Sequence, residues 1–531
     1  MKFLKATVLA AWAVTGAVAR PQGAPADDVE VALAEQDLDA TTISQLTGPN
    51  TGCEEACDIL LEGYGPKKVF TRDTSAYHDV TKSYWAAQQA EVSPMCIFVP
   101  STDAEVSFFV LASRAMDCPF AARSGGHAAF AGASSSQGGM TVLFRDLNEI
   151  TLSDDKSVVS IGPGNTWGQV YRALEPHGLA VVGGRMSDIG VGGLLTGGGI
   201  SYYSNQYGWA LDNVESFEVV NAKPATEHIL KASETENPDL YWALRGGGNN
   251  LGLVTKFNLY TIPSTLLQGT TRVYTENQSS EVLDAFFHVA SNAKVDGHAQ
   301  QYVIFGHMGG SNMISAELTY TKNVSDPAIF QKYRSIPAIS DTTSTKTLLE
   351  YCDDISAGDQ KGLREMFWNR SFRMNEEFAN WVVKHFYSVV PSIDNLPGAV
   401  SGLVFQVITE PILEKMARAG GNALGLDISN GPILLIHMLS MWNSTSHDDA
   451  MYRFANDFFA DVAAEAESQA LGNEFIYMNY ASQFQDVISS YGSANKARLR
   501  EIAAKYDPFA VYQTLQPGHF KLTHAPVSNP Y

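Results

Sequence analysis

Glycine-rich loops are the feature of this sequence with the clearest chemical meaning. They read Arg-Ser-Gly-Gly-His at 123–127, Gly-Pro-Gly at 162–164, a glycine-rich run at 190–199, and Gly-Gly-Gly at 246–248. Glycine tolerates positive φ and lets backbone N–H groups approach an anion, so such loops suit a pyrophosphate held by main-chain amides rather than by lysines. A single loop of this kind would be no more than a tight turn. Four of them so close together predict an extended cofactor that carries phosphate groups.

Several familiar catalytic motifs are absent from the sequence. It contains no His-Glu-x-x-His, no Gly-x-Ser-x-Gly and no Gly-Lys-Ser/Thr, the signatures of zinc proteolysis, serine hydrolysis and nucleotide hydrolysis. Neither 162–164 nor 190–193 completes Gly-x-Gly-x-x-Gly with a following acid, which argues against a Rossmann-type NAD site. Cys53 and Cys57 are spaced like metal ligands, but no second cysteine pair or histidine-rich segment follows them, so we expect no metal.

The composition describes a folded, acidic protein. The chain has 531 residues, 45% of them apolar, with 36 Lys and Arg against 57 Asp and Glu, for a net charge of −21. Such a surface repels phosphate backbones, which excludes nucleic acid and anionic membranes as expected partners. A small uncharged or cationic molecule fits the net charge better, and the oligomeric state is left open.

The amino-terminal residues have the anatomy of a secretory signal peptide. Lys2 and Lys5 precede an apolar run at 6–13 and a small-x-small site at 17–19. We therefore expect residues 1–19 to be removed and 20–52 to form an amino-terminal tail of a secreted, soluble protein. No other stretch approaches the length needed to span a bilayer.

An oxidising compartment would permit disulfides and glycans. The five cysteines allow one or two bridges, with at least one thiol left free. Acceptor sequons begin at Asn277, Asn323, Asn369 and Asn443, and each would be glycosylated if it lies on the surface of a secreted chain.

Periodicity indicates an α+β fold. Short apolar runs at 96–99, 140–144, 158–161, 218–220 and 253–259 predict strands, and they alternate with helical patterns at 104–116 and 166–174. Further along, 301–305 and 313–321 predict a hairpin that turns at 309–312, with more strands at 403–408 and 433–441.

Two helices are expected in the last third of the chain. Met451, Phe454, Ala455, Phe458 and Val462 recur at helical spacing and predict one buried helix face. A helix through 497–505 should stop before Asp507-Pro508, because the residue before proline avoids helical angles. A sheet backed by helices is the expected architecture of the middle of the chain.

The order of the motifs resembles a known family. The stretches are Arg123–His127, Asp146-Leu147-Asn148, 162–167, 190–199, Tyr207-Gly208, Asp212-Asn213-Val214, 242–248 through Phe257, 477–480, Tyr491-Gly492 and 506–508. In this order, they resemble the FAD-binding domain of the vanillyl-alcohol-oxidase superfamily and its berberine-bridge-enzyme-like branch, in a fungal secreted form. The resemblance covers nearly the whole mature chain.

The resemblance implies a two-domain α+β fold of the PCMH FAD-binding type. It assigns 53–263, with a core at about 92–263, to the FAD-binding domain and 264–473 to a substrate-binding domain of a sheet plus helices. Residues 474–531 would complete the FAD domain. The implied cofactor contacts are Arg123, Ser124, Gly125, Gly126, His127, Ile189, Gly192, Gly193, Thr196, Gly197, Gly198, Asn213, Val254 and Asn479.

The family attaches FAD covalently, and His127 occupies the position of the histidine that is bonded to the flavin. The alternative is a histidine hydrogen-bonded in a turn. Relatives with a second attachment use a cysteine four residues before the Gly-Val-Gly-Gly run, where this chain has Met186, so we expect a single link. By this resemblance, Ile189 falls where relatives place a residue that controls the reaction with oxygen; the alternative is that it packs a strand.

The proton acceptor expected for substrate oxidation is Tyr480. A phenol is a useful base near neutral pH only where positive charge stabilises its anion, and the alternative is a core tyrosine bonded to the backbone. Tyr202 and Tyr203 could line the same cleft, while His437 and Gln406 receive no role.

The expected function is that of a FAD-linked oxidoreductase. It would take hydride from a small organic substrate, a secondary metabolite, alcohol or amine, with O₂ as acceptor and H₂O₂ as by-product. A secreted oligosaccharide oxidase, a dehydrogenase with another acceptor and a flavin-binding protein without turnover stay open as alternatives.

Overall fold

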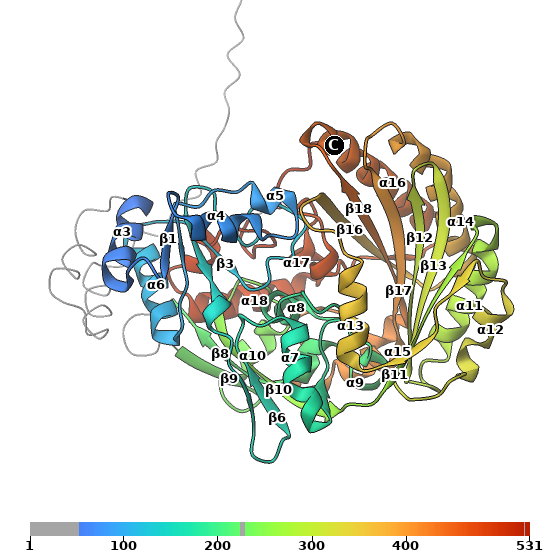
Figure 1. Ribbon diagram of the computed structural model, residues 1–531, viewed down its shortest axis with the longest axis horizontal. Coiled ribbons are helices and arrows are strands. Elements are labelled where there is room, and N and C mark those ends of the chain that lie inside the picture. The colour runs from blue at the N-terminus through green and yellow to red at the C-terminus, as the bar shows by residue number, and fades with distance from the viewer. Residues whose placement is uncertain (1–51, 223–228, 525) are drawn as a thin grey trace, which may run out of the picture.

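The computed structural model describes residues 52–531 except 223–228 and 525 (Figure 1). The expected signal peptide and all but the last residue of the expected tail lie outside these residues. In the described part of the chain, the strands form three sheets, and helices cover their faces. The expected α+β architecture is confirmed.

The first sheet has the order β1-β2-β4-β3. Its pairs are parallel except β1 with β2. Helix α6 follows β2 and begins at Thr102, whose side chain accepts a hydrogen bond from the N–H of Glu105, as an N-cap does. The elements are α3 (Cys53–Tyr64), β1 (Val69–Thr71), α4 (Ser75–Lys82), α5 (Ala87–Ala90), β2 (Cys96–Phe98), α6 (Asp103–Ala115), β3 (Phe120–Arg123) and β4 (Met140–Leu143).

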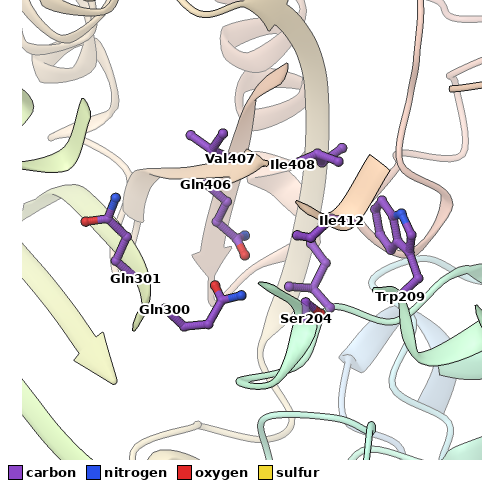
Figure 2. Close-up of a pocket in the computed structure, with 9 residues that line it drawn as sticks. Ser204, Trp209, Gln300, Gln301, Gln406, Val407, Ile408 and Ile412 are labelled. Atoms are coloured by element: carbon purple, nitrogen blue, oxygen red, sulfur yellow. The ribbon is translucent and has the colours of Figure 1, made fainter. Parts of the chain in front are cut away.

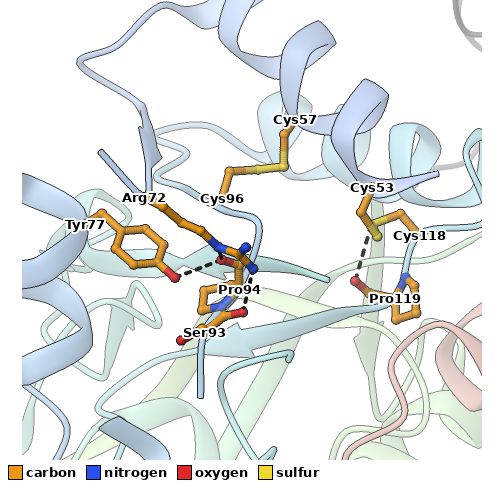
Figure 3. The surroundings of a disulfide bond; sticks show 9 residues. All are labelled: Cys53, Cys57, Arg72, Tyr77, Ser93, Pro94, Cys96, Cys118 and Pro119. Carbon is orange, nitrogen blue, oxygen red and sulfur yellow. Dashed lines mark hydrogen bonds between the residues drawn. A yellow bond between two sulfur atoms is a disulfide. The ribbon is translucent and has the colours of Figure 1, made fainter. Parts of the chain in front are cut away.

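Two disulfides hold α3, one to β2 through Cys57–Cys96 and one to the connection between α6 and β3 through Cys53–Cys118 (Figure 3). The remaining cysteine, Cys352, is buried and free. The prediction of one or two bridges with a free thiol is confirmed, and the metal-like spacing of Cys53 and Cys57 results from two separate bridges.

The second sheet is antiparallel, with the order β5-β6-β10-β8-β9, and β7 pairs with the end of β10. The predicted boundary at 263/264 falls between β10 and the first long strand of the third sheet. The elements are β5 (Ile150–Leu152), β6 (Val158–Ile161), α7 (Trp167–Leu174), β7 (Leu179–Val181), α8 (Val191–Gly197), α9 (Ser204–Tyr207), β8 (Val214–Val220), β9 (Ile229–Ser233), α10 (Pro238–Leu244) and β10 (Leu253–Pro263).

The third sheet is the largest, with nine antiparallel strands in the order β14-β11-β13-β12-β17-β18-β16-β19 and β15 paired with β11. Its strands are β11 (Leu267–Tyr274), β12 (Ala299–Met308), β13 (Ser311–Tyr320), β14 (Ser340–Asp341), β15 (Ser344–Lys346), β16 (Arg364–Arg373), β17 (Val400–Ile408), β18 (Ile433–Trp442) and β19 (Gly472–Asn473).

One face of this sheet is covered by helices, on the right of Figure 1. The helices are α11 (Ser279–Ser291), α12 (Gln331–Ser335), α14 (Glu376–Val389) and α16 (Asp448–Ser468). The predicted face of α16 is confirmed, because Met451, Phe454, Ala455, Phe458 and Val462 are all buried in this core.

Alternation along the strands sends the neighbouring side chains to the opposite face. On β16, Met366 and Trp368 enter the helix-covered core, so Glu365, Phe367 and Asn369 point toward the first two sheets. That face is the one that can line a site between the two halves of the molecule.

The hairpin between β12 and β13 is tighter than predicted. Ser311 and Asn312 belong to β13, and the turn consists of Gly309 and Gly310, with φ of 57° and 74°. Two successive positive φ angles are typical of a type I′ turn, and glycine adopts them at no steric cost.

The carboxy-terminal segment returns to the glycine-rich half. It contains α17 (Val487–Ser490), α18 (Ser493–Tyr506) and α19 (Val511–Thr514), and the predicted end of α18 before Asp507-Pro508 is confirmed. The remaining helices α13 (Leu348–Ala357) and α15 (Glu410–Lys415) lie in the loops of the third sheet. No helix within the described residues is long and apolar enough to cross a membrane.

One of the four sequons, that of Asn369, does not meet the condition of lying on the surface. Asn369 lies on β16 with no exposed surface, and its amide both donates to the carbonyl of Tyr477 and accepts from the Tyr477 N–H. A glycan has no room there, whereas Asn277, Asn323 and Asn443 are exposed.

Candidate active site

The glycine loops touch one another backbone to backbone. A Cβ on Gly125 would collide with the backbone nitrogen of Gly190, and one on Gly190 with that of Gly125. Ser124 joins a third loop, because its hydroxyl donates to the carbonyl of Pro163 at 2.6 Å and accepts from the Gly192 N–H at 3.1 Å. Glycine at 125 and 190 is therefore required by chain packing.

The end of the glycine run is packed against the carboxy-terminal segment. A Cβ on Gly197 would collide with Oδ1 of Asn479, and Gly198, at φ 143°, lies against the ring of Tyr477. The Asn479 amide donates to the carbonyl of Leu194 at 3.1 Å. The segment that carries Tyr480 is thereby fixed to α8.

Other positions in these loops are free of such packing. A Cβ on Gly193 would meet no heavy atom within 4 Å. The backbone N–H groups of 124–127 find no acceptor among the described residues. Open space beside unused amides is what a bound diphosphate requires, so these residues fit the FAD that the sequence predicts.

His127 lies in an enclosed, partly acidic corner. Its ring stacks on Trp85, with centroids 4.2 Å apart and planes at 13°, and its Nε2 lies 3.3 Å from Oδ2 of Asp359. Neither atom has a hydrogen-bond partner among the described residues. His127 is thus held in place without its nitrogens being used by a turn hydrogen bond.

Asp188 lies within 4.8 Å of the same two ligand atoms, so the three residues could hold a metal ion. Its carboxylate already pairs with Lys361 at 2.8 Å and accepts from Ser356 at 3.0 Å. Because Lys361 already neutralises the charge of Asp188, we interpret the cluster as an ion-pair network and assign no metal to it.

Tyr480 is held by a cation that the sequence analysis did not identify. Nη2 of Arg185 donates to the phenolic oxygen of Tyr480 at 2.7 Å. The ring of His437 stacks on that of Tyr480, with centroids 4.3 Å apart and planes at 6°. Burial, and then the charge of Arg185, lower the pKa of His437 to about 3, so this imidazole is neutral at neutral pH.

A row of aromatic rings connects this cluster with His127. Phe367 lies 5.4 Å from the Trp85 ring and 4.7 Å, edge-on, from the His437 ring. The row comes from α4–α5, β16 and β18, which bring residues far apart in sequence to one side of the large sheet. His127 and Tyr480 therefore stand at the two ends of this row of rings.

Glu365, beside this row, is an unpaired acid. The residue has no exposed surface, and neither carboxyl oxygen has a hydrogen-bond partner among the described residues. Burial, and then the charge of Asp359, raise the pKa of Glu365 to about 9.

Two of the predicted cofactor contacts, Arg123 and Asn213, have side chains that form hydrogen bonds within the protein. The side chain of Arg123 turns away, donates to the carbonyls of Val80 and Ser83, and stacks on Tyr84, and burial lowers its pKa. The amide of Asn213 donates to the carbonyls of Tyr207 and Trp209. These donors are therefore used within the protein.

The other predicted contacts are distributed around α8 and β10. The Thr196 hydroxyl donates back to the carbonyl of Gly192 at 3.1 Å. Val254 is buried on β10, and Ile189 is a half-buried residue that packs against the same core. Gly126, at φ 71°, has no room for a Cβ beside Arg123 and Tyr84.

Tyr202 and Tyr203 follow the glycine run and are both 2% exposed. The Tyr202 hydroxyl donates to the carbonyl of Arg185 at 3.2 Å, so it supports the loop that carries the cation. Gln406 lines a small pocket with Gln300, and the two amides point toward each other (Figure 2).

Comparison with known proteins agrees with this geometry. Residues 94–229 match the model of a FAD binding domain. The FAD-dependent monooxygenase tpcD of Cochliobolus heterostrophus is 32% identical over 499 residues, covering 90% of this chain and 96% of that protein.

Two solved structures share the fold. BBE-like 1 of Physcomitrella patens has a TM-score of 0.70 and 18% identity, covering 88% of this chain and 99% of that one. The glucooligosaccharide oxidase of Acremonium strictum, which carries a 6-S-cysteinyl, 8α-N1-histidyl FAD, has a TM-score of 0.69 and 19% identity, covering 89% of this chain and 100% of that one.

Fold and sequence together define a FAD-binding oxidoreductase. The chain belongs to the family of FAD-binding oxidoreductases that includes the fungal proteins named FAD-dependent monooxygenases, and it shares the fold of BBE-like 1.

Proposed function

We propose that this protein binds FAD covalently through His127 and oxidises a small organic molecule, a secondary metabolite, beside Tyr480. When bound, the flavin supplies an acceptor for the hydride that leaves the substrate carbon. The observation that carries the proposal is the Arg185–Tyr480 hydrogen bond at the end of the row of rings that begins at His127.

Tyr480 acts as the base in this proposal. It takes the substrate proton onto its phenolic oxygen, and Nη2 of Arg185, which donates to that oxygen at 2.7 Å, orients it for the transfer. His437 cannot replace it, because its ring lies parallel to Tyr480 and its pKa of about 3 makes it a poor proton acceptor. Its stacking fixes the plane of the phenol.

His127 provides the attachment point. Its stacking on Trp85 sets the plane of the imidazole, and the carboxylate of Asp359 beside Nε2 favours a proton on that nitrogen, which leaves Nδ1 with its lone pair free. The histidyl FAD of the Acremonium oxidase supports this role. Met186 forms no thioether, so we propose one link where that relative has two.

Mass spectrometry tests the attachment. The tryptic peptide Ser124–Arg145 from acid-precipitated, freshly purified protein should be heavier by one FAD. A yellow protein with an unmodified Ser124–Arg145 peptide would show that attachment through His127 is wrong, and a colourless protein would refute the function as a whole.

The electron acceptor separates two candidate reactions. We propose O₂ as acceptor, with H₂O₂ as product, in a secreted protein. The relatives named monooxygenases favour a second candidate, in which one oxygen atom enters the product. Turnover under ¹⁸O₂ with simultaneous measurement of peroxide distinguishes them, since an oxidase releases labelled peroxide and leaves the product unlabelled.

A further inference from the structure

Asp359 has a side chain that, within the described residues, meets no hydrogen-bond or ion-pair partner except His127. Its Oδ2 lies 3.3 Å from Nε2 of His127, slightly beyond the ordinary N–H···O range of about 2.7–3.2 Å. Both atoms are sealed from solvent, and neither makes a hydrogen bond in that part of the chain. Buried polar atoms are normally paired, so two unused atoms facing each other at the candidate attachment point call for a role.

Trp85 positions both members of this pair. Its indole ring stacks on the imidazole of His127, with centroids 4.2 Å apart. Its backbone carbonyl accepts from the N–H of Gly362 at 2.7 Å, three residues after Asp359. One residue therefore holds the histidine by its ring and the loop of the acid by its backbone, so the contact between them is set by the fold.

The other acids near His127 are already neutralised. Asp188, whose carboxylate lies within 4.8 Å of the same two atoms, pairs with Lys361 at 2.8 Å. Glu365 keeps its proton at neutral pH, because burial, and then the charge of Asp359, raise its pKa to about 9. Of these three acids, Asp359 is the one whose side-chain oxygens accept no hydrogen bond from a described residue.

The second ring nitrogen of His127 faces open space. Nδ1 makes no hydrogen bond to a described residue and, unlike Nε2, is not sealed from solvent. An imidazole that carries its proton on Nε2 has its lone pair on Nδ1. The ring thus presents Nε2 to the carboxylate and a nucleophilic Nδ1 to the space beside it.

We infer that Asp359 prepares His127 for covalent attachment of FAD: it holds the Nε2 proton, directs the Nδ1 lone pair toward the flavin, and accepts the proton when the bond from Nδ1 to carbon forms. This inference rests on the proposed function, because it concerns the same attachment. Asp359 is a positioning residue for the attachment and takes no part in substrate oxidation.

The attachment is an oxidation whose atoms and electrons balance with O₂. One C–H bond of the flavin methyl group breaks, and one bond forms between its carbon and Nδ1 of His127. The methyl proton goes to solvent, and the Nε2 proton goes to Asp359, because a ring substituted at Nδ1 would otherwise keep a positive charge. The electron pair of the C–H bond passes to O₂, which takes up two protons and becomes H₂O₂.

Attachment to the full-length chain is measured without substrate. Protein produced in riboflavin-starved cells receives saturating FAD in air-saturated buffer, and the FAD retained by acid-precipitated protein is followed with time. The amide of Asp359→Asn can still accept from Nε2 but cannot take the proton. This variant should attach FAD at least about tenfold more slowly than the parent, since general acid–base catalysis contributes about 10²–10⁴. An unchanged rate would overturn the inference.

Chemical rescue separates proton transfer from a structural role. Asp359→Ala should also attach FAD slowly, and added formate should increase its rate, because a small carboxylate can enter the space that the side chain leaves. Formate should not change the rate of the parent. If Asp359→Ala did not respond to formate, the proton-accepting role of Asp359 would be wrong.

The matched control is Asp188→Asn, which removes the same charge from the same cluster. Its amide can still accept from Lys361 and Ser356, so this variant should attach FAD like the parent. A loss as large as that of Asp359→Asn would assign the effect to the total charge and refute the specific role of Asp359.

The parent protein decides the proposed function separately. If its Ser124–Arg145 peptide carried no FAD, attachment through His127 would itself be wrong. If that peptide carried FAD and Asp359→Asn attached FAD equally fast, the inference about Asp359 would fail alone.

Discussion

Replacing Glu365 by glutamine should stabilise the protein at alkaline pH. Glu365 is fully buried and its pKa is raised from 4.5 to about 9, so the folded protein holds a proton that the unfolded chain has released. Stability contributed by this group is complete below pH 4.5 and falls as the pH rises toward 9. Each pH unit in that window costs about 1.4 kcal/mol.

pH 8 lies about 3.5 units above 4.5, so the parent has lost about 5 kcal/mol of its stability at that pH. Glu365→Gln has no proton to release and therefore retains this stability. Urea unfolding followed by far-UV circular dichroism at pH 5, 6.5 and 8 measures this. The gain should grow with pH and be small at pH 5.

The control is Glu377→Gln, an exposed glutamate on α14, which should leave the difference from the parent constant with pH. If the difference in unfolding free energy between Glu365→Gln and the parent were also the same at every pH, Glu365 would be ionised in the folded protein. The reasoning from its burial would then be refuted.

Three further outcomes are expected. Arg185→Gln and Tyr480→Phe should each lower kcat/KM by about 10²–10⁴, and the double variant should be no worse than Tyr480→Phe alone, because the cation acts through the phenol; additive losses would contradict this. Gly125→Ala should lower the melting temperature, because its Cβ has no space, whereas Gly193→Ala should keep the melting temperature and lower FAD content; equal melting temperatures would contradict the assignment. Glycopeptide mapping should find Asn369 unmodified, and a glycan there would be incompatible with its buried hydrogen bonds.

The sequence predicts those parts of the fold that depend on neighbouring residues. The apolar face of α16 follows from helical spacing, and the end of α18 follows from Asp507-Pro508. The strand positions in the large sheet follow from short apolar runs. Each of these signals is local, so it survives without knowledge of tertiary contacts.

Tertiary contacts decide what the sequence analysis missed. Arg185 and Tyr480 are 295 residues apart, and nothing in the type or spacing of an arginine marks it as the partner of a distant phenol. The pairing of the cysteines was open for the same reason. Glycines at 125 and 190 suggested phosphate binding, but their nearest neighbour is each other's backbone.

The dependence of α8 on Asn479 has a consequence for biosynthesis. The glycine run near residue 197 emerges from the ribosome long before the segment that supports it, and the large sheet must form in between. A nascent chain that ends before Asn479 therefore lacks the contacts that hold the end of the glycine run. Cofactor loading becomes a late event, restricted to finished molecules, and a truncated product would be released without colour.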